Sequence, residues 1–146
     1  MRNLFVSIAA AVIACIISCS CNAKDVVIKV QDLPQAAQSF ISTHFKGIDV
    51  TFVIKDGNEY DVRFANGWEL EFNRKGEWEK IDCKHEAVPS SIIALIPESI
   101  PAYIQSNFAN AFVTEISKDR WEYDIELSNG LDLEFSLNGK LKKVDD

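Results

Sequence analysis

The stretch from residue 59 to residue 72 reads EYDVRFANGWELEF. Apolar and charged residues alternate on both sides of Asn66-Gly67, with the period of two that sends successive side chains to opposite faces of a strand. Asn-Gly between two alternating runs is a strong hairpin signal, because both turn positions must tolerate a positive φ. The stretch therefore predicts two antiparallel strands with one apolar and one polar face.

The same pattern recurs later in the chain, where residues 122–135 read EYDIELSNGLDLEF. Residues 33–82 lie over residues 96–145 without a gap, and matched residues recur along the whole alignment. The matched pairs include Pro34 and Pro97, Ile41 and Ile104, Phe45 and Phe108, Asn66 and Asn129, Phe72 and Phe135, and Gly76 and Gly139. The sequence thus indicates a tandem repeat, with repeat 1 at 33–82, a linker at 83–95 and repeat 2 at 96–146.

Each repeat is predicted to be one helix followed by a four-stranded antiparallel meander. In repeat 1, Asp32-Leu33-Pro34 fits a helix N-cap with proline near the first turn. In repeat 2, Pro101 either lies in the first turns of the helix or forces a later start. A unit of this size has a marginal core, and joining two units edge to edge removes two open sheet edges. We expect an α+β fold with one extended sheet and the helices on one face.

The first residues are typical of an export signal. Residues 1–18 contain Arg2 and then an apolar run that is too short to span a bilayer. Ile16-Ile17-Ser18-Cys19 resembles a bacterial lipobox, so we expect lipidation of Cys19 and a tether at 19–32. Ordinary secretion, with cleavage after Ala23, is the alternative. The protein is expected in the periplasm or at the outer membrane, attached to the membrane by its lipid.

Besides the lipidated Cys19, two cysteines remain in the expected mature protein, in a compartment where disulfides form. Cys21 and Cys83 either pair, or Cys83 stays free and partly buried. Cys83-Lys84-His85 supplies two potential metal ligands without a matching second pair, which is a weak metal signal. The sequence leaves the question of a metal site open.

The charge of the 146-residue chain is −7, with 22 acidic and 15 basic residues. This balance argues against a general nucleic-acid-binding protein, which needs a basic surface. The polar face of the predicted strands is acidic, and like charges on adjacent strands repel. The candidate binding face comprises Glu59, Asp61, Glu69, Glu71, Glu122, Asp124, Asp132 and Glu134, with Trp121 and Trp78 as candidate contact residues.

Two interpretations of this acidic face remain open. It is either a solvated surface that keeps the protein soluble, or a surface for a basic partner or for divalent cations such as Ca²⁺. Catalysis is not expected, since no nucleophile elbow, phosphate loop or HExxH pattern occurs. His44 and His85 have no Ser or Cys at a recognisable spacing. No cofactor is expected.

The repeated motifs resemble those of the PepSY-like proteins with the beta-lactamase-inhibitory-protein-like fold, which are exported proteins of Bacteroidetes-type bacteria. The resemblance is carried by residues 59–64, 66–72, 76–83, 122–127 and 129–135, whereas Gly139-Lys140-Leu141 departs from the Gly-x-Trp pattern. It implies two helix-plus-sheet repeats joined in a curved sheet. The function of that family is largely unassigned, so the resemblance transfers no binding residue.

Taken together, we expect an exported, non-enzymatic binding or interaction module. Its partner would be a protein or peptide of the cell envelope, engaged in an inhibitor-like or regulatory role. The alternative is a divalent-cation binding or sensing protein that uses the acidic sheet face.

Overall fold

The computed structural model describes residues 25–146, so the predictions for the signal peptide, Cys19 and Cys21 lie outside the described residues. Nine strands, three α-helices and one 3-10 helix follow one another along the chain. They are β1 (Asp25–Ile28), η1 (Val30–Asp32), α2 (Gln35–His44), β2 (Val50–Asp56), β3 (Glu59–Phe64), β4 (Glu69–Phe72), β5 (Trp78–Asp82), α3 (Ser90–Ile93), α4 (Ser99–Asn107), β6 (Val113–Lys118), β7 (Glu122–Leu127), β8 (Asp132–Ser136) and β9 (Leu141–Asp145).

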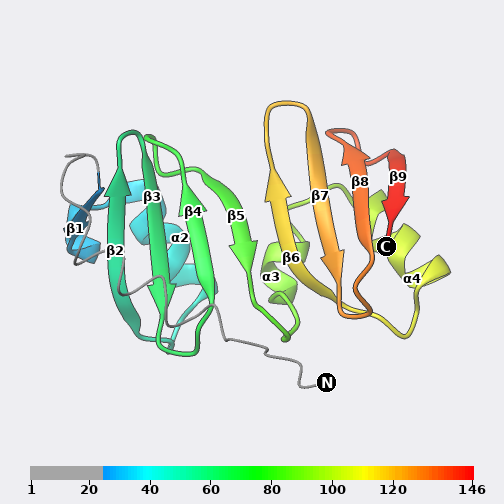
Figure 1. Cartoon of the computed structure of the whole chain (residues 1–146), viewed down its shortest axis with the longest axis horizontal. Helices are drawn as coiled ribbons and strands as arrows, with labels where there is room; N and C mark the ends of the chain where they lie inside the picture. The colour runs from blue at the N-terminus through cyan, green and yellow to red at the C-terminus, as the bar shows by residue number, and fades with distance from the viewer. Residues whose placement is uncertain (1–24) are drawn as a thin grey trace, which may run out of the picture.

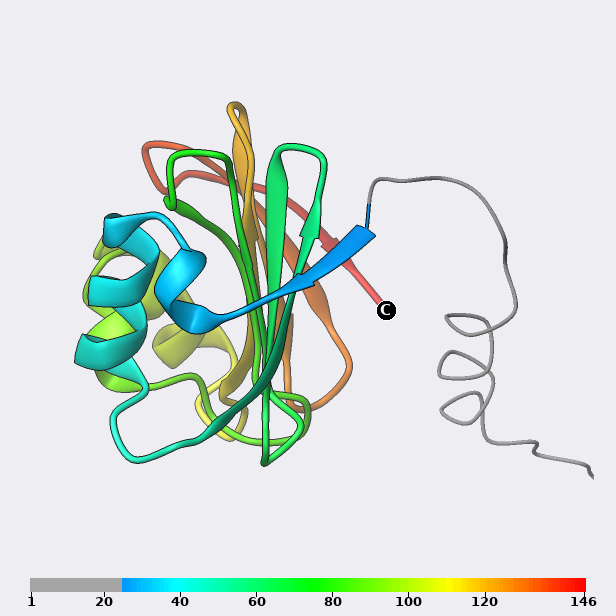
Figure 2. The ribbon, with the colours of Figure 1, turned by 90° about the vertical axis from the view of Figure 1, so that its left-hand side faces the viewer.

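The strands form one antiparallel sheet in sequence order, from β1 at one edge to β9 at the other (Figure 1). Figure 2 shows the helices of residues 25–146 on one face of a curved sheet, and this part of the chain places no helix on the other face. We call the uncovered side the open face. The predicted α+β class, the single extended sheet and the one-sided placement of the helices are confirmed.

The two Asn-Gly hairpins form as predicted, but with a different turn. The amide of Gly67 donates to the carbonyl of Phe64, and Phe64 pairs with Trp68, so the loop has three residues. Gly67 and Gly130 have φ of +88° and +84°, whereas neither asparagine has a positive φ. This geometry is a turn closed by a glycine bulge, which needs one left-handed residue rather than two.

The ladders on either side of the β5–β6 junction are irregular at corresponding places. The β2–β3 register shifts between Val50 and Phe52, and the β6–β7 register shifts between Val113 and Glu115. The β4–β5 ladder shifts at Phe72, and the β8–β9 ladder shifts at Phe135. Each shift adds one residue to a strand and thereby changes which of its side chains face the helices.

The core lies between the sheet and the helices. Ala37 and Ile41 of α2 and Ile100 and Ile104 of α4 are buried against it. At its centre are Phe72 and Phe135, both fully buried. Phe40 meets Phe72 edge to face at 5.7 Å between ring centroids, and Tyr103 meets Phe135 in the same way at 5.8 Å. Truncating either buried phenylalanine costs about 3–5 kcal/mol in comparable cores.

The start of the described chain differs from the expected tether. Residues 25–28 form β1, which pairs with β2 because its Val and Ile side chains suit a strand. Asp32 does not cap α2, since its carboxylate accepts the amide of Lys29 and closes η1. Pro34 stands at the N-cap position instead. Pro101 is the third residue of α4, where its missing N–H costs nothing.

The expected linker contains α3, which fills the junction between the two parts of the core. Ile92 of α3 and the neighbouring Cys83 are fully buried. Cys83 is a free thiol, and burial raises its pKa to about 12. His85 is exposed, so it does not share a metal site with the buried Cys83. No helix within residues 25–146 combines the length and apolar character that crossing a bilayer requires.

The turn glycines provide a test of the packing between turn and helix. A Cβ atom added to Gly76, whose φ is +79°, would lie 2.8 Å from the Cβ of Pro34 and 2.9 Å from the amide nitrogen of Ala37. We expect Gly76→Ala to lower the free energy of unfolding by about 3 kcal/mol or more, because backbone strain and overpacking add. Urea unfolding measures this loss.

Gly67→Ala is the matched control, since Gly67 has φ +88° and open space around the added atom. Its free energy of unfolding should fall by only about 1–2 kcal/mol, which is the cost of placing alanine in the left-handed conformation. Equal losses in the two variants would show that the turn does not pack against α2 as described.

Candidate functional site

The open face carries its charges in two rows that run across the strands. The central row contains Asp61, Glu71, Lys80, Ser117, Asp124, Glu134 and Lys143, each directly opposite the next on the adjacent strand. The second row, which we call the carboxylate row, contains Glu69, Asp82, Glu115, Glu126, Asp132 and Asp145. Six adjacent strands therefore each contribute one carboxylate to this row.

Adjacent strands lie about 4.8 Å apart, so neighbouring carboxylates in a row repel each other unless a cation intervenes. Cations do intervene at the β3–β5 end. Arg63 pairs with Glu69. The ammonium of Lys84 lies 2.8 Å from Glu69 and 2.6 Å from Asp82. The carboxylate row is therefore neutralised at this end, whereas no ion pair within residues 25–146 reaches Asp61 and Glu71 of the central row.

The junction holds one further ion pair, and the far edge strand holds two, one of which joins Lys142 to Glu122. Lys80 lies 2.9 Å from Glu115, and Lys143 lies 2.5 Å from Asp145. Between these pairs the charge is unbalanced. Within residues 25–146, no ion pair reaches the four carboxylates that lie there, Asp124, Glu126, Asp132 and Glu134.

These four carboxylates surround a hollow in the surface. A depression of about 290 Å³ is lined by six acidic side chains and Ile125. We call it the acidic depression, and its acidic side chains are Glu115, Asp124, Glu126, Asp132, Glu134 and Asp145. A hollow with such a lining favours a cationic ligand, because it concentrates negative potential at one place.

The pKa values show where this crowding has a cost. Partial burial, together with the charges of Glu122 and Glu134, raises the pKa of Asp124 above its ordinary value. Burial also raises the pKa of Glu115, and this effect outweighs the opposing pair with Lys80. The pKa of Asp82 is lowered, because the hydrogen bonds from Lys84 outweigh the effect of partial burial. Ionisation of Asp124 and Glu115 is thus less favourable in the folded protein than ionisation of Asp82.

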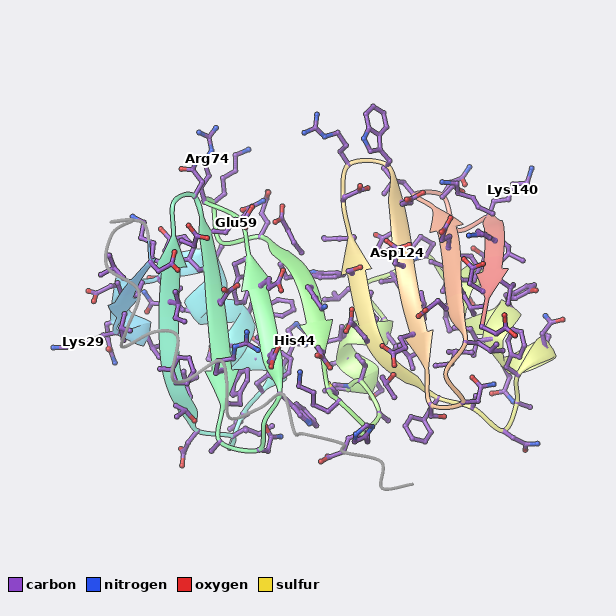
Figure 3. The ribbon with its side chains drawn as sticks, viewed as in Figure 1. Lys29, His44, Glu59, Arg74, Asp124 and Lys140 are labelled. Carbon is purple, nitrogen blue, oxygen red and sulfur yellow. The ribbon has the colours of Figure 1, made fainter. Side chains whose placement is uncertain are left out.

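Most of the predicted face residues lie on the open face. Asp61, Glu69, Glu71, Asp124, Asp132 and Glu134 belong to the two rows. Glu59 and Glu122 lie at the first residue of β3 and β7, and Glu122 is paired with Lys142. Figure 3 shows Glu59 and Asp124 in different halves of the sheet, so the predicted residues form an extended surface rather than one cluster.

The two predicted tryptophans are not part of this surface. Trp78 is 7% exposed and packs on the helix side, where its ring stacks with Phe40. The register shift at Phe72 turns both Trp78 and Ile81 toward the core, which simple alternation does not predict. Trp121 is 70% exposed in the turn that joins β6 and β7. The carboxylate of Asp119 holds that turn by accepting the amides of Trp121 and Glu122.

The candidate binding face chosen from the sequence lacks four members of the carboxylate row, Asp82, Glu115, Glu126 and Asp145. Asp82 and Glu115 become neighbours only when β5 pairs with β6. The sequence signal that could have placed these two residues side by side was the alternation along β5, combined with the predicted edge-to-edge joining of the two repeats. The described residues contain no group of three or more His, Cys, Asp or Glu side chains arranged to hold a metal ion.

Comparisons with known proteins bear on this face. The sequence model of a family described as "Putative beta-lactamase-inhibitor-like, PepSY-like" matches residues 19–70 and 58–143. The chain is similar to a "putative calcium-regulated periplasmic protein" from Bacteroides thetaiotaomicron, at 38% identity and a TM-score of 0.78 over 84% of this chain and 97% of that one. Comparison with curated proteins found no match.

Two proteins from Bacteroides vulgatus are similar to the same extent. One is a "putative periplasmic protein" with 36% identity and a TM-score of 0.79, covering 85% of this chain and 98% of that one. The other is a "putative periplasmic protein of unknown function" with 38% identity and a TM-score of 0.78, covering 84% and 99%. These likenesses extend across both halves of the sheet.

The opposite pKa shifts on the open face predict opposite pH dependences. Because its pKa is raised on folding, ionised Asp124 costs stability above that pKa, and the cost vanishes below the ordinary value of 3.8. We expect Asp124→Asn to raise the free energy of unfolding at pH 7, by less than about 1 kcal/mol because solvent screens the group. The gain should vanish near pH 3.

Asp82→Asn is the matched comparison. The lowered pKa of Asp82 stabilises the fold above its ordinary value of 3.8, and this contribution is lost as the pH falls through the lowered value. Asp82→Asn should therefore destabilise the protein at pH 7. Urea unfolding across the pH range tests both variants, and shifts of the same sign would contradict the described charge pattern.

Proposed function

The chain belongs to the beta-lactamase-inhibitor-like, PepSY-like family, and from this membership we propose that it is an exported, non-enzymatic binding protein that engages a basic protein or peptide partner. The observation that carries the proposal is the acidic depression, where four carboxylates without ion pairs lie on the face that no helix covers. A partner with Lys or Arg side chains would neutralise them and relieve their repulsion. The role is inhibitor-like or regulatory.

The same open face supports binding rather than catalysis. General acid or base catalysis needs a carboxyl group with a strongly raised pKa in an enclosed site. The carboxylates of the depression are partly or fully exposed on an open sheet. An open sheet face that carries many carboxylates is suited to binding an extended cationic surface.

We also propose that the two halves are copies of one ancestral unit. The gapless match of residues 33–82 with 96–145 supports this interpretation. So do the register shifts at corresponding places in the ladders. Under this proposal the open face arose by joining two sets of strands with acidic polar faces.

The proposal for the open face is tested with a defined cationic probe. We expect octalysine to bind the wild-type protein at low salt and to weaken as salt is added. The double variant Glu126→Gln with Asp132→Asn should bind about fivefold more weakly, because it removes two unpaired carboxylates from the depression. Calorimetry measures both affinities.

Two controls make this experiment specific. Glu98→Gln removes one exposed carboxylate on the helix side, and it should leave octalysine binding unchanged. A photo-crosslinking residue at Ser117, in the central row, should capture a partner in cells more strongly than one at Gln105 on α4. Equal capture from the two positions, or capture that survives the double variant, would contradict the proposal.

Calcium binding is the second candidate. It is favoured by the likeness to the B. thetaiotaomicron protein described as calcium-regulated, and by carboxylate oxygens that suit Ca²⁺. The described residues do not form a ready-made chelating group, so calcium would act between the rows as a counter-ion. Millimolar Ca²⁺ would then raise the melting temperature more than Mg²⁺ does. No difference between the two ions removes this candidate.

We further propose export to the periplasmic side with a lipid anchor on Cys19. The lipobox-like sequence and the periplasmic relatives support this location. Cys19→Ala should abolish labelling of the protein by an alkyne fatty acid and release it from the membrane fraction. Cys21→Ala is the control and should change neither. A mature N-terminus at Lys24 would show ordinary secretion instead.

A further inference from the structure

A second hollow lies where the two halves of the sheet meet, away from the carboxylate rows. The β5–β6 ladder joins only Lys80–Asp82 to residues 115–117, and Figure 1 shows the strands diverging beyond it. The space that opens there is a cleft of about 640 Å³ between α2, the β4–β5 turn and the β6–β7 turn. We call it the junction cleft. Its volume is in the range of small-molecule sites.

The cleft has an apolar wall and a basic wall. Phe40 and Trp78 form the apolar wall, with their rings stacked at 6.3 Å between centroids. Lys118 and Arg120 come from the β6–β7 side. The ammonium of Lys118 lies 3.8 Å from the centroid of the Trp78 ring, so it is held over the aromatic face rather than extended into solvent.

The ammonium of Lys118 has donors to spare. Within the described residues it makes no hydrogen bond and no ion pair. Burial lowers its pKa even though Glu77 and Glu79 attract its charge. A half-buried ammonium without an acceptor is costly, and a ligand oxygen would remove that cost.

The acidic side chains near the cleft are partly engaged elsewhere. The amide of Asn73 donates to Glu77 at 2.8 Å. The carboxylate of Asp119 accepts two backbone amides of the turn. Glu79 is the remaining acidic residue that lines the cleft. These neutral donors leave the carboxylate charges in place, so three carboxylates and two basic groups line the cleft. Within residues 25–146, the half-buried charged group that lacks an acceptor is the Lys118 ammonium, and an anionic group would be held there.

Lys55, the equivalent lysine of the first half, does not lie in the cleft, so a lysine held over an aromatic ring in a cleft is found here only for Lys118 of this pair. Lys55 stands 63 positions before Lys118 and lies 5.7 Å from the ring centroid of Tyr60. It is exposed, and it does not line the junction cleft. Lys55 is therefore a matched control for substitutions at Lys118.

We propose that the junction cleft binds a small carboxylate that carries an apolar or aromatic group, such as the C-terminal residue of a peptide. The carboxylate would take the free donors of Lys118 and Arg120, and the apolar group would lie against Phe40 and the exposed edge of Trp78. This site is distinct from the open face, and neither site requires the other.

The probe for this site is N-acetyl-phenylalanine, with N-acetyl-phenylalaninamide as the probe that lacks the carboxylate. We expect the acid to shift the NMR signal of the Trp78 indole N–H and to bind at least about tenfold more tightly than the amide, because a charged hydrogen bond is lost with the amide. Lys118→Met, which keeps the length of the side chain, should weaken binding of the acid about tenfold.

Lys55→Met should bind the acid as the wild type does, and the thermal melt of each variant confirms that it is folded. The double variant Glu126→Gln with Asp132→Asn should also bind the acid normally, which separates this site from the open face. Three outcomes would each overturn the proposal. They are equal binding of the acid and the amide, unchanged binding of the acid by Lys118→Met, and no shift of the Trp78 indole signal at the highest soluble concentration of the acid.

Discussion

Alternation along the strands is the constraint on which the rest of the structure depends. With a period of two, every apolar side chain that enters the core forces its neighbours in the strand onto the opposite face. Because all the helices pack on one side, those neighbours remain uncovered. The buried Phe72 and Phe135 and the carboxylates beside them are therefore two outcomes of one pattern. The acidic face follows from the choice of residues at positions that the fold leaves open.

The β5–β6 pairing joins strands β1–β5 and strands β6–β9 into one sheet. It removes two sheet edges and lets Ile92 of α3 close the core between α2 and α4. It also brings Asp82 opposite Glu115, and so completes the carboxylate row across the junction. Because this ladder is short, the strands separate beyond it and leave the junction cleft. One set of backbone hydrogen bonds thus determines the continuity of the open face and the hollow beside it.

The hairpins, the helices α2 and α4 and the acidic face could be predicted because local patterns determine them, whereas the single turn of α3 lies in the expected linker. Asn66-Gly67 marks a turn, and the alternation around it assigns each side chain to a face. The position of Trp78 could not be predicted, since a register shift reverses its side and leaves no mark in the alternation. The junction cleft also escaped prediction, because it depends on where one ladder ends. Strand β1 lies within the expected tether, because a short edge strand has only a weak sequence signal of its own.

The burial of Cys83 has a consequence for the redox chemistry of its thiol. Disulfide exchange proceeds through the thiolate, and a thiol with a pKa of about 12 supplies almost none at neutral pH. Full burial also keeps oxidants and other thiols away from the sulfur. The folded domain therefore keeps Cys83 reduced by structure alone, and covalent dimers through this residue require the core to open first.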